Sequence, residues 1–475
     1  MRMTMDEIAS CLKTDVAGLA CDNGIICSVA TDSKKISKNG LFVCIKGQKA
    51  DGHDFVTEAL KNGASAILAQ KPLPQIPIPV FVVEDTVKAL GKLATCWRNK
   101  TGAIVVGVTG TAGKTTLKEV LSSILSEHGK VAKSQLNHNN QIGLPISILE
   151  TDGDEKFWIM EAGISHDGDM DDLGAILNPD IGLVLNAGAG HLEGLAKKGV
   201  AWHKARLFNY LAPGGKAVIC ADYPELVQET KKYGVEFVTF TTKPQNHDLE
   251  WYSRSRDDTD ETCELMLDGN ICKIKMPLSG EAGEEVSIAA GTCAALLGLS
   301  ISEISSGFSN VKLPPQRFNE ETIASWHVID DSYNANPLSM KRMLQIGKAK
   351  ANSLGRPFYA ILGEMGELGR DTGILHEELG KTLGELKPDF VFFKGKSFED
   401  FRKGFLAIRP CNNEKLYLIN DASDFESLLK KTILQGQSMN TGGVILFKGS
   451  RSNKLEMFVR SFKEIIVPRV AHNVL

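Results

Sequence analysis

The sequence of 475 residues has no apolar run close to the roughly 18–20 residues that a membrane-spanning helix needs. It also has no apolar segment of signal-peptide type at its start, where Thr4 to Glu7 instead form the pattern of a helix capping box. Its ten cysteines form no C-x-x-C pair, which disfavours zinc ribbons and is typical of scattered thiols in a reducing compartment. The formal net charge of −4 argues against nucleic acid binding through bulk charge. We therefore expect a cytoplasmic protein without membrane insertion or a nucleic acid partner.

A dinucleotide fingerprint of the G-x-G-x-x-G type is missing as well, so NAD is not an expected ligand. No internal repeat, coiled coil or low-complexity tract is evident. What is present is an ordinary globular composition, with 43% apolar and 24% charged residues, which allows a large buried core. At roughly 100–200 residues per domain, a chain of this length is expected to form two to four domains.

The order of apolar segments and turn signals divides the chain into three α/β units, 1–98, 99–315 and 316–475. The first is predicted to be a small mixed α/β domain. The second alternates strands and helices, which is typical of a mostly parallel sheet covered by helices. The third alternates again and is predicted to be a Rossmann-like, doubly wound domain. Its expected strands are 326–329, 358–362, 390–393, 416–419 and 444–447.

The stretch from Gly107 to Thr116 reads as a phosphate-binding loop between an apolar strand and a helix. This order points backbone N–H groups and the positive end of the helix dipole at an anion. A glycine-rich turn without a ligand is the alternative. Lys114 is placed to reach the outer phosphates, and a threonine hydroxyl is placed to hold Mg²⁺. The general pattern has a glycine where this chain has Val108, so the match is to a shorter variant. The predicted nucleotide contacts are Gly110, Thr111, Gly113, Lys114, Thr115 and Thr116.

Two polar residues follow strands of the predicted parallel sheet. Glu161 ends the apolar run 157–160, and His191 comes shortly after the run 181–185. Because ligands bind beyond the carboxyl ends of parallel strands, both residues are expected on the same edge as the phosphate loop. A carboxylate and an imidazole there are reasonable metal ligands or partners of metal ligands, although either could be a polar residue that only ends its strand.

Further polar clusters lie in the first and third units. In the first unit they are Thr31-Asp32-Ser33 and Asp51-Gly52-His53, which would also suit ordinary surface turns. In the third unit they follow the expected strands, at 330–337, 363–369 and 448–451.

Taken together, these stretches resemble the Mur ligases, the ATP-dependent amide-forming enzymes of peptidoglycan precursor assembly. The resemblance runs nearly end to end and includes 139–145, which fits the family pattern Asn-Asn-x-Ile-Gly-x-Pro, and the diagnostic stretch 330–337. It implies an enzyme that uses ATP and two Mg²⁺ ions to join D-alanyl-D-alanine to UDP-N-acetylmuramoyl-tripeptide. A monomer is expected, although the sequence does not reveal the oligomeric state. It also implies that the first domain binds the uridine nucleotide. The Asp-Asn-Pro-Arg motif of the diaminopimelate-adding relative is absent.

The resemblance implies a role for each matching residue. Thr115 and Glu161 would hold one Mg²⁺ and His191 a second, and Lys204 would approach that metal as a carbamate. Lys114, Lys204, His191 and Asp331 are the expected catalytic residues. The further nucleotide contacts implied are Arg317, Asn334 and Asn336. The implied substrate contacts are Thr31, Asp32, Ser33, Asp51, His53, Asn139, Asn140, Lys448, Ser450 and Arg451, with His376 also expected to face the cleft.

The sequence departs from the family at two places. Where many members have His-Asn-x-x-Asn, the corresponding stretch is 280–286, and Arg206 stands where close relatives often have glutamate. Two alternative functions therefore stay open. One is a related ligase that adds a different amino acid or acts on folates, although the uridine-domain motifs argue against folate. The other is a P-loop ATPase or regulatory module that forms no bond.

Overall fold

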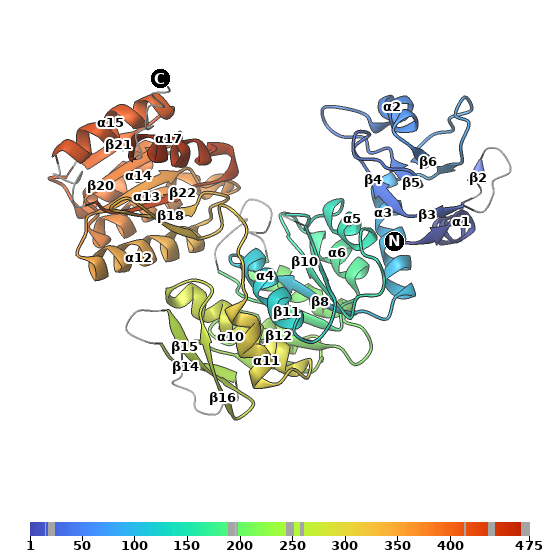
Figure 1. Cartoon of the computed structure of the whole chain (residues 1–475), viewed down its shortest axis with the longest axis horizontal. Helices are drawn as coiled ribbons and strands as arrows, with labels where there is room; N and C mark the ends of the chain where they lie inside the picture. The colour runs from blue at the N-terminus through green and yellow to red at the C-terminus, as the bar shows by residue number, and fades with distance from the viewer. Residues whose placement is uncertain are drawn as a thin grey trace, which may run out of the picture.

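The computed structural model describes residues 1–14, 16–17, 24–135, 137–188, 195, 198–243, 251–256, 261–412, 415–435 and 442–466. Figure 1 shows three bodies along the chain, with the N-terminal unit and the C-terminal unit on opposite sides of the central one. Separate sheets form these bodies, so the predicted three-part α/β organisation is confirmed, while the boundaries at 98/99 and 315/316 stay a prediction. No helix within the described ranges is both long and apolar enough to cross a membrane.

The N-terminal unit is built on a five-stranded sheet of order β2-β7-β6-β5-β4, parallel except for β2, with a small β1-β3 pair beside it. The capping box expected at the start of the chain is present, with Thr4 as the N-cap of α1 and Glu7 reaching back to it. The elements are β1 (Met3–Thr4), α1 (Met5–Leu12), β2 (Val16–Ala17), β3 (Ile25–Ile26), β4 (Ser28–Ala30), β5 (Gly40–Val43), η1 (Gly52–Phe55), α2 (Val56–Lys61), β6 (Ala64–Ala69), β7 (Val80–Val82) and α3 (Thr86–Lys100).

The cysteine expectation is wrong at one pair. Cys11 of α1 and Cys96 of α3 are joined in a disulfide, because the two helices pack side by side and bring their Cα atoms to 6.4 Å. The free cysteines that the structure describes are buried, apart from Cys27 and Cys411.

The central unit has a six-stranded sheet of order β13-β12-β11-β8-β10-β9, parallel throughout as predicted. Its main elements are β8 (Ile104–Thr109), α4 (Lys114–Leu125), β9 (Val131–Lys133), α5 (Gly143–Leu149), β10 (Phe157–Glu161), α6 (Asp169–Leu177), β11 (Ile181–Val184), α8 (Val200–Ala205), η2 (Arg206–Tyr210), β12 (Lys216–Cys220), α9 (Pro224–Lys231), β13 (Phe237–Phe240), α10 (Gly280–Leu296) and α11 (Ile301–Ser309).

Successive side chains along these strands point to opposite faces of the sheet, so both faces are apolar, and a different set of helices packs on each. Val105 and Trp158 belong to a core shared with α3, α5 and α6, whereas Val106 and Ile159 belong to one shared with α4, α10 and α11. Because α3 starts in the N-terminal unit and packs on the central one, the first core spans both units.

One sheet was not predicted. An antiparallel sheet of order β14-β15-β16 packs on the outer side of α10 and completes the second core. Its strands are β14 (Trp251–Arg256), β15 (Thr262–Leu267) and β16 (Asn270–Lys275).

The C-terminal unit has the predicted doubly wound form, with a sheet of order β17-β18-β22-β19-β20-β21 in which only β17 is antiparallel to its neighbour. Helices α12 to α14 share a core with one face, and α15 and α17 with the other. The elements are β17 (Asn319–Ile323), β18 (Trp326–Asp331), α12 (Pro337–Leu354), β19 (Phe358–Gly363), η3 (Gly369–Asp371), α13 (Thr372–Leu386), β20 (Phe390–Lys394), α14 (Phe398–Ile408), β21 (Leu416–Leu418), α15 (Ala422–Gln435), β22 (Val444–Lys448), η5 (Arg451–Asn453) and α17 (Glu456–Ile466).

Candidate active site

The phosphate loop is the turn between β8 and α4, as predicted. Gly113 precedes the helix with a φ of 80°, and a Cβ there would lie 2.9 Å from Leu185, so both the backbone and the space require glycine. The Lys114 ammonium bends back over the loop and donates to the Gly110 carbonyl at 3.0 Å. The first-turn N–H groups of α4, a helix of 12 residues, therefore open toward the same space as a lysine cation.

Asn186, just after β11, holds the loop in shape. Its side-chain oxygen accepts hydrogen bonds from the backbone N–H groups of Thr111, at 2.8 Å, and Ala112, at 3.0 Å. Its amide nitrogen donates to the Ala112 carbonyl at 3.0 Å. The side chain is fully buried, so these bonds define the path of the first half of the loop.

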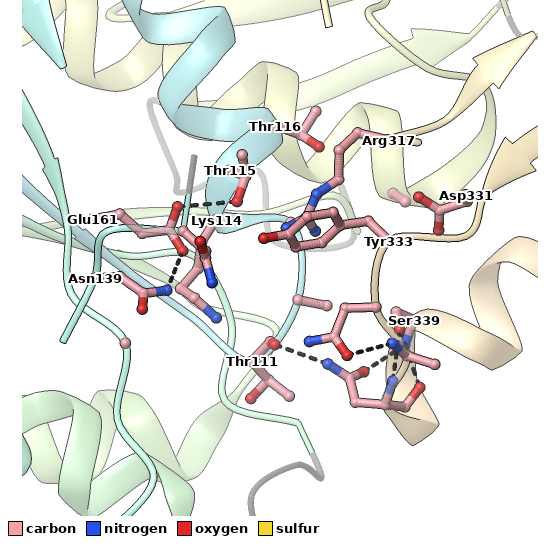
Figure 2. Close-up of a pocket in the computed structure, with 18 of the residues that line it drawn as sticks. Thr111, Lys114, Thr115, Thr116, Asn139, Glu161, Arg317, Asp331, Tyr333 and Ser339 are labelled. Carbon is pink, nitrogen blue, oxygen red and sulfur yellow. Dashed lines mark hydrogen bonds between the residues drawn. The ribbon is translucent and has the colours of Figure 1, made fainter. Parts of the chain in front are cut away.

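Glu161 lies at the end of β10 beside the phosphate loop, as its position after a parallel strand predicted. Thr115 donates its hydroxyl to one carboxylate oxygen at 3.0 Å, and the Asn139 amide donates to the other at 2.9 Å. Figure 2 shows the three side chains converging with Lys114 at one side of the cavity. A hydroxyl and a carboxylate are the hard oxygen ligands that Mg²⁺ takes, so these residues fit the ion that the sequence led us to expect.

Lys204 belongs to α8 and is 1% exposed. Burial and the neighbouring charge of Lys114 hold the pKa of its amine well below the usual value, against the opposing effect of Glu161. Burial likewise lowers the pKa of Lys114, again opposed by Glu161. The buried amine of Lys204 thus lies near the charges of Lys114 and Glu161, and burial disfavours its charged form.

The C-terminal unit contributes the opposite wall. The Arg317 guanidinium stacks over the ring of Tyr333 with 4.0 Å between its central carbon and the ring centroid. Lys448 forms an ion pair with Asp331 and donates to the Asn334 carbonyl at 3.0 Å. These contacts tie together strand ends β18 and β22 and the loop that follows β18.

Asn336 connects this wall to the phosphate loop. Its side-chain oxygen accepts from the Ser339 N–H at 2.8 Å and so caps α12, while its amide nitrogen donates to the Thr111 carbonyl at 3.0 Å. Figure 2 shows this bond crossing between the two units.

The two walls enclose a cavity of about 490 Å³. The residues predicted from the sequence that line it are Thr111, Gly113, Lys114, Thr115, Thr116, Asn139, Asn140, Glu161, Arg317, Asp331, Asn334, Asn336 and Lys448. Gly110 supplies a carbonyl behind them.

Other predicted residues lie elsewhere. Ser450 is buried and donates to the Glu364 carbonyl at 2.6 Å. Arg451 is exposed and pairs with Glu456, although its guanidinium carbon lies 5.8 Å from the ring centroid of the cavity residue Tyr333. His376 is buried, with both ring nitrogens bonded to backbone groups, and does not face the cavity. His191 lies outside the described residues, so its metal role stays a prediction.

The polar clusters of the N-terminal unit do not line this cavity. Ser33 donates to Glu58 at 2.6 Å. His53 accepts from the Gln70 N–H at 3.1 Å, so its other ring nitrogen donates to Asp51 at 2.6 Å. Side chains of both clusters are thus bonded to other groups of the N-terminal unit in this structure. Thr31, Asp32 and Asp51 keep partly or fully exposed side chains, and a role of the clusters in uridine binding stays a prediction.

Sequence reasoning missed Tyr333, Glu285 and Arg342, which also line the cavity. Tyr333 lay inside the motif 330–337 and could have been chosen as the only aromatic residue there. The departing segment 280–286 forms the start of α10 and places Ala282, Glu285 and Val286 at the cavity. Arg206, the other departure, is turned to α6, where its Nε donates to Asp171 at 2.7 Å.

Models of three protein domains match the chain in order. Residues 26–98 match the Mur ligase family catalytic domain, 108–294 the Mur ligase middle domain, and 316–451 the Mur ligase glutamate ligase domain. A UDP-N-acetylmuramoyl-tripeptide–D-alanyl-D-alanine ligase of Bacillus subtilis is 30% identical over 98% of this chain and 99% of its own length. The chain belongs to the Mur ligase family.

Solved Mur ligase structures share its fold. MurF from Acinetobacter baumannii superimposes with a TM-score of 0.88 at 25% identity, over 98% of this chain and 99% of that one. MurF from Thermotoga maritima, solved in complex with ADP, has a TM-score of 0.79 at 28% identity, over 93% and 98% of the two chains. The resemblance inferred from the sequence, the ligase class and the three-domain fold are therefore confirmed.

Proposed function

We propose that this Mur ligase joins D-alanyl-D-alanine to UDP-N-acetylmuramoyl-tripeptide with ATP as the energy source, in the assembly of peptidoglycan precursors. The observation that carries the proposal is the joint cavity. Lys114, Thr115 and Glu161 on the central unit face Arg317 and Asp331 on the C-terminal unit. Full-length relatives that bear this activity in their names support the choice of substrates.

ATP suits the phosphate-loop side of the cavity. Its outer phosphates would meet the α4 N-terminus and Lys114, because positive charge and free N–H groups converge there. Thr115 and Glu161 would hold Mg²⁺, which neutralises charge on the phosphoryl oxygens. Arg317 and Tyr333 offer a cation and an aromatic face to the rest of the nucleotide.

The reaction begins with attack of the tripeptide carboxylate on the γ-phosphorus, which breaks the bond to ADP and forms an acyl phosphate. Lys114 stabilises the transferred group by charge, and the protein contributes mainly by positioning. The amine of D-alanyl-D-alanine then attacks the carbonyl carbon, phosphate leaves and the amine loses a proton. An α-amino group has a pKa of roughly 7.7–8.0, so only a modest base or a slightly alkaline pH is needed.

Water must be excluded because it would destroy the acyl phosphate. We propose that the C-terminal unit closes on the central one during each turnover, as the division of the cavity between the two units suggests. Small-angle scattering with and without an ATP analogue and the tripeptide nucleotide tests this. Superimposable profiles would contradict closure.

We also propose that Lys204 acts as a carbamate, formed when its neutral amine adds CO₂ and loses a proton. Its burial beside Lys114 and Glu161 supports this, since the modified group carries a negative charge that suits Lys114 and a nearby cation. In Lys204→Ala, activity should be lost and partly restored by short carboxylic acids. Full activity of the variant without added acid would refute the carbamate.

The central experiment mixes the protein with ATP, UDP-N-acetylmuramoyl-tripeptide and D-alanyl-D-alanine and detects the pentapeptide nucleotide by mass. A related ligase would instead form product with another amino acid or with a folate. A non-ligating ATPase would release ADP independently of both other substrates, and that result would overturn the proposal. Parallel reactions with tripeptides that contain diaminopimelate or lysine identify the third residue.

A further inference from the structure

A buried chain of side chains links the C-terminal unit to the phosphate loop. Arg342 of α12 donates two hydrogen bonds to the Glu285 carboxylate of α10, Nη1 at 2.7 Å and Nη2 at 3.0 Å. Glu285 also accepts from the amide nitrogen of Asn186 at 2.7 Å and from the Tyr223 hydroxyl at 3.2 Å. Glu285 is 2% exposed and Asn186 is fully buried, so water does not compete for these bonds.

The orientation of the Asn186 amide is what connects this chain to the nucleotide site. Its nitrogen faces a carboxylate and the Ala112 carbonyl, and its oxygen consequently faces the N–H groups of Thr111 and Ala112. Rotation of the amide by 180° would place its oxygen against Glu285 and its nitrogen against two N–H donors. Glu285 therefore reinforces the orientation that the N–H groups of Thr111 and Ala112 and the Ala112 carbonyl also require, and it adds a charged acceptor to that set.

Glu285 itself is an anion, and its cationic partner is on the other domain. Within the central unit it is bonded to Asn186 and Tyr223, both neutral. The charge of Arg342 reaches it only across the domain interface, where the Arg342 side chain is 11% exposed. A buried carboxylate is stabilised by a bidentate guanidinium more than by neutral donors, so the pair favours the arrangement in which the two domains meet.

The same helix touches the loop a second time. Asn336, at the start of α12, donates to the Thr111 carbonyl, while Asn186 accepts from the Thr111 N–H. The Thr111 N–H also donates to the backbone carbonyl of Asn186 at 3.2 Å. The Thr111 carbonyl is thus held directly by α12, and the Thr111 N–H is held by Asn186, whose side chain contacts Glu285.

We propose that Arg342 is a positioning residue that couples domain closure to the phosphate loop: its ion pair with Glu285 orients Asn186 and thereby shapes the loop for the nucleotide. The inference rests on the proposed function for its kinetic readout. It goes beyond that function because it assigns a role to the segment 280–286, where this chain departs from its family.

The test uses the full chain and four variants: Arg342→Met, Arg342→Lys, Glu285→Gln and the double variant Arg342→Met/Glu285→Gln. Affinity for a non-hydrolysable ATP analogue is measured by calorimetry, and KM and kcat are measured for ATP and the tripeptide nucleotide. Arg342→Met should weaken analogue binding and raise the KM for ATP at least tenfold, while the KM for the tripeptide nucleotide changes less than twofold. Arg342→Lys keeps the positive charge but cannot donate two parallel hydrogen bonds to the carboxylate. Its analogue affinity and its KM for ATP should lie between those of wild type and those of Arg342→Met.

The double variant should bind the analogue no more weakly than the more affected single variant, because both changes break one connection. Lys341→Met, an exposed position next to Arg342 on the same helix, is the matched control and should behave as wild type. The proposed coupling would be overturned by any of three results. These are an unchanged analogue affinity in Arg342→Met, losses of affinity that add up in the double variant, and a fall in kcat without a change in affinity. A wild-type protein that forms no product would refute the proposed function instead. The calorimetry would still show whether Arg342 affects binding of the ATP analogue.

Discussion

Asn336 allows the contact between the two domains to be separated from the stability of the helix that carries it. Its side-chain oxygen caps α12 by accepting from the Ser339 N–H, and its amide nitrogen bonds to the Thr111 carbonyl. Serine and aspartate cap helices about as well as asparagine. Asn336→Ser keeps the cap with a side chain too short to reach Thr111, and Asn336→Asp replaces the donor with an oxygen that repels the carbonyl.

The size of the effect follows from the single bond that is lost. A neutral hydrogen bond contributes about 0.5–1.5 kcal/mol, and each 1.4 kcal/mol or so is a factor of ten in an equilibrium. If the closed arrangement is the active one, Asn336→Ser should lower kcat/KM for ATP by about two- to tenfold. Asn336→Asp should lower it further, since an anion then faces the carbonyl of Thr111.

Steady-state kinetics over a range of ATP concentrations measure both values, and thermal unfolding followed by circular dichroism shows whether the cap is intact. We expect melting temperatures close to wild type in both variants. Equal kinetics in wild type and Asn336→Asp would refute the idea that this contact matters for activity. A marked loss of melting temperature in Asn336→Ser would show that the cap, and not the contact between the domains, dominates.

Three further predictions concern the metal, the disulfide and a helix crossing. Glu161→Gln should raise the Mg²⁺ concentration for half-maximal activity at least tenfold, because an anionic oxygen ligand is lost; an unchanged magnesium titration would contradict the assignment. Alkylation with iodoacetamide in denaturant should label two more thiols after reduction than before, and Cys11→Ser should abolish the difference; equal labelling would exclude the disulfide. Gly404→Ala should lower the free energy of unfolding by about 1–3 kcal/mol or more, because a Cβ on this residue of α14 would lie 1.8 Å from the Glu377 carbonyl of α13. Gly102→Ala, with open space around it, should leave the free energy of unfolding unchanged, and urea titrations measure both values.

Local order along the chain made much of the active site predictable. Strand, glycine loop and helix follow each other directly from β8 to α4, so the phosphate loop could be recognised from adjacent residues. Glu161 could be placed beside it because parallel strands end at one edge of a sheet, and β8 and β10 are neighbours. Both inferences need only the sheet type and the strand ends.

The antiparallel sheet was missed although its signal was present. Residues 262–267 alternate between half-buried and buried side chains, and Asp268-Gly269, both with positive φ, is a favoured hairpin turn. The strand-helix alternation on either side obscured this shorter period.

Partners far apart in the sequence could not be predicted. Asn186 and Glu285 are 99 residues apart, and Glu285 and Arg342 are 57 apart on different domains. Each has an unremarkable local pattern. The packing of α10 on the central sheet brings Glu285 to Asn186, and the packing of α12 against α10 brings Arg342 to Glu285. Similarly, nothing local distinguished Lys448, which lines the cavity and reaches Asp331, from Arg451, which is exposed and pairs with Glu456.

The residue that made the phosphate loop look irregular has a structural explanation. Val108 is fully buried within β8 and pairs with Leu183 of β11 on one side and Glu161 of β10 on the other. The strand continues through Thr109, so the turn begins only at Gly110 and no glycine is needed two residues earlier. In this shorter loop the N–H groups of Thr111 and Ala112 bind Asn186. The N–H groups at the start of α4 are then the backbone donors left for phosphate, which makes Lys114 and the orientation of Asn186 more important here than in a longer loop.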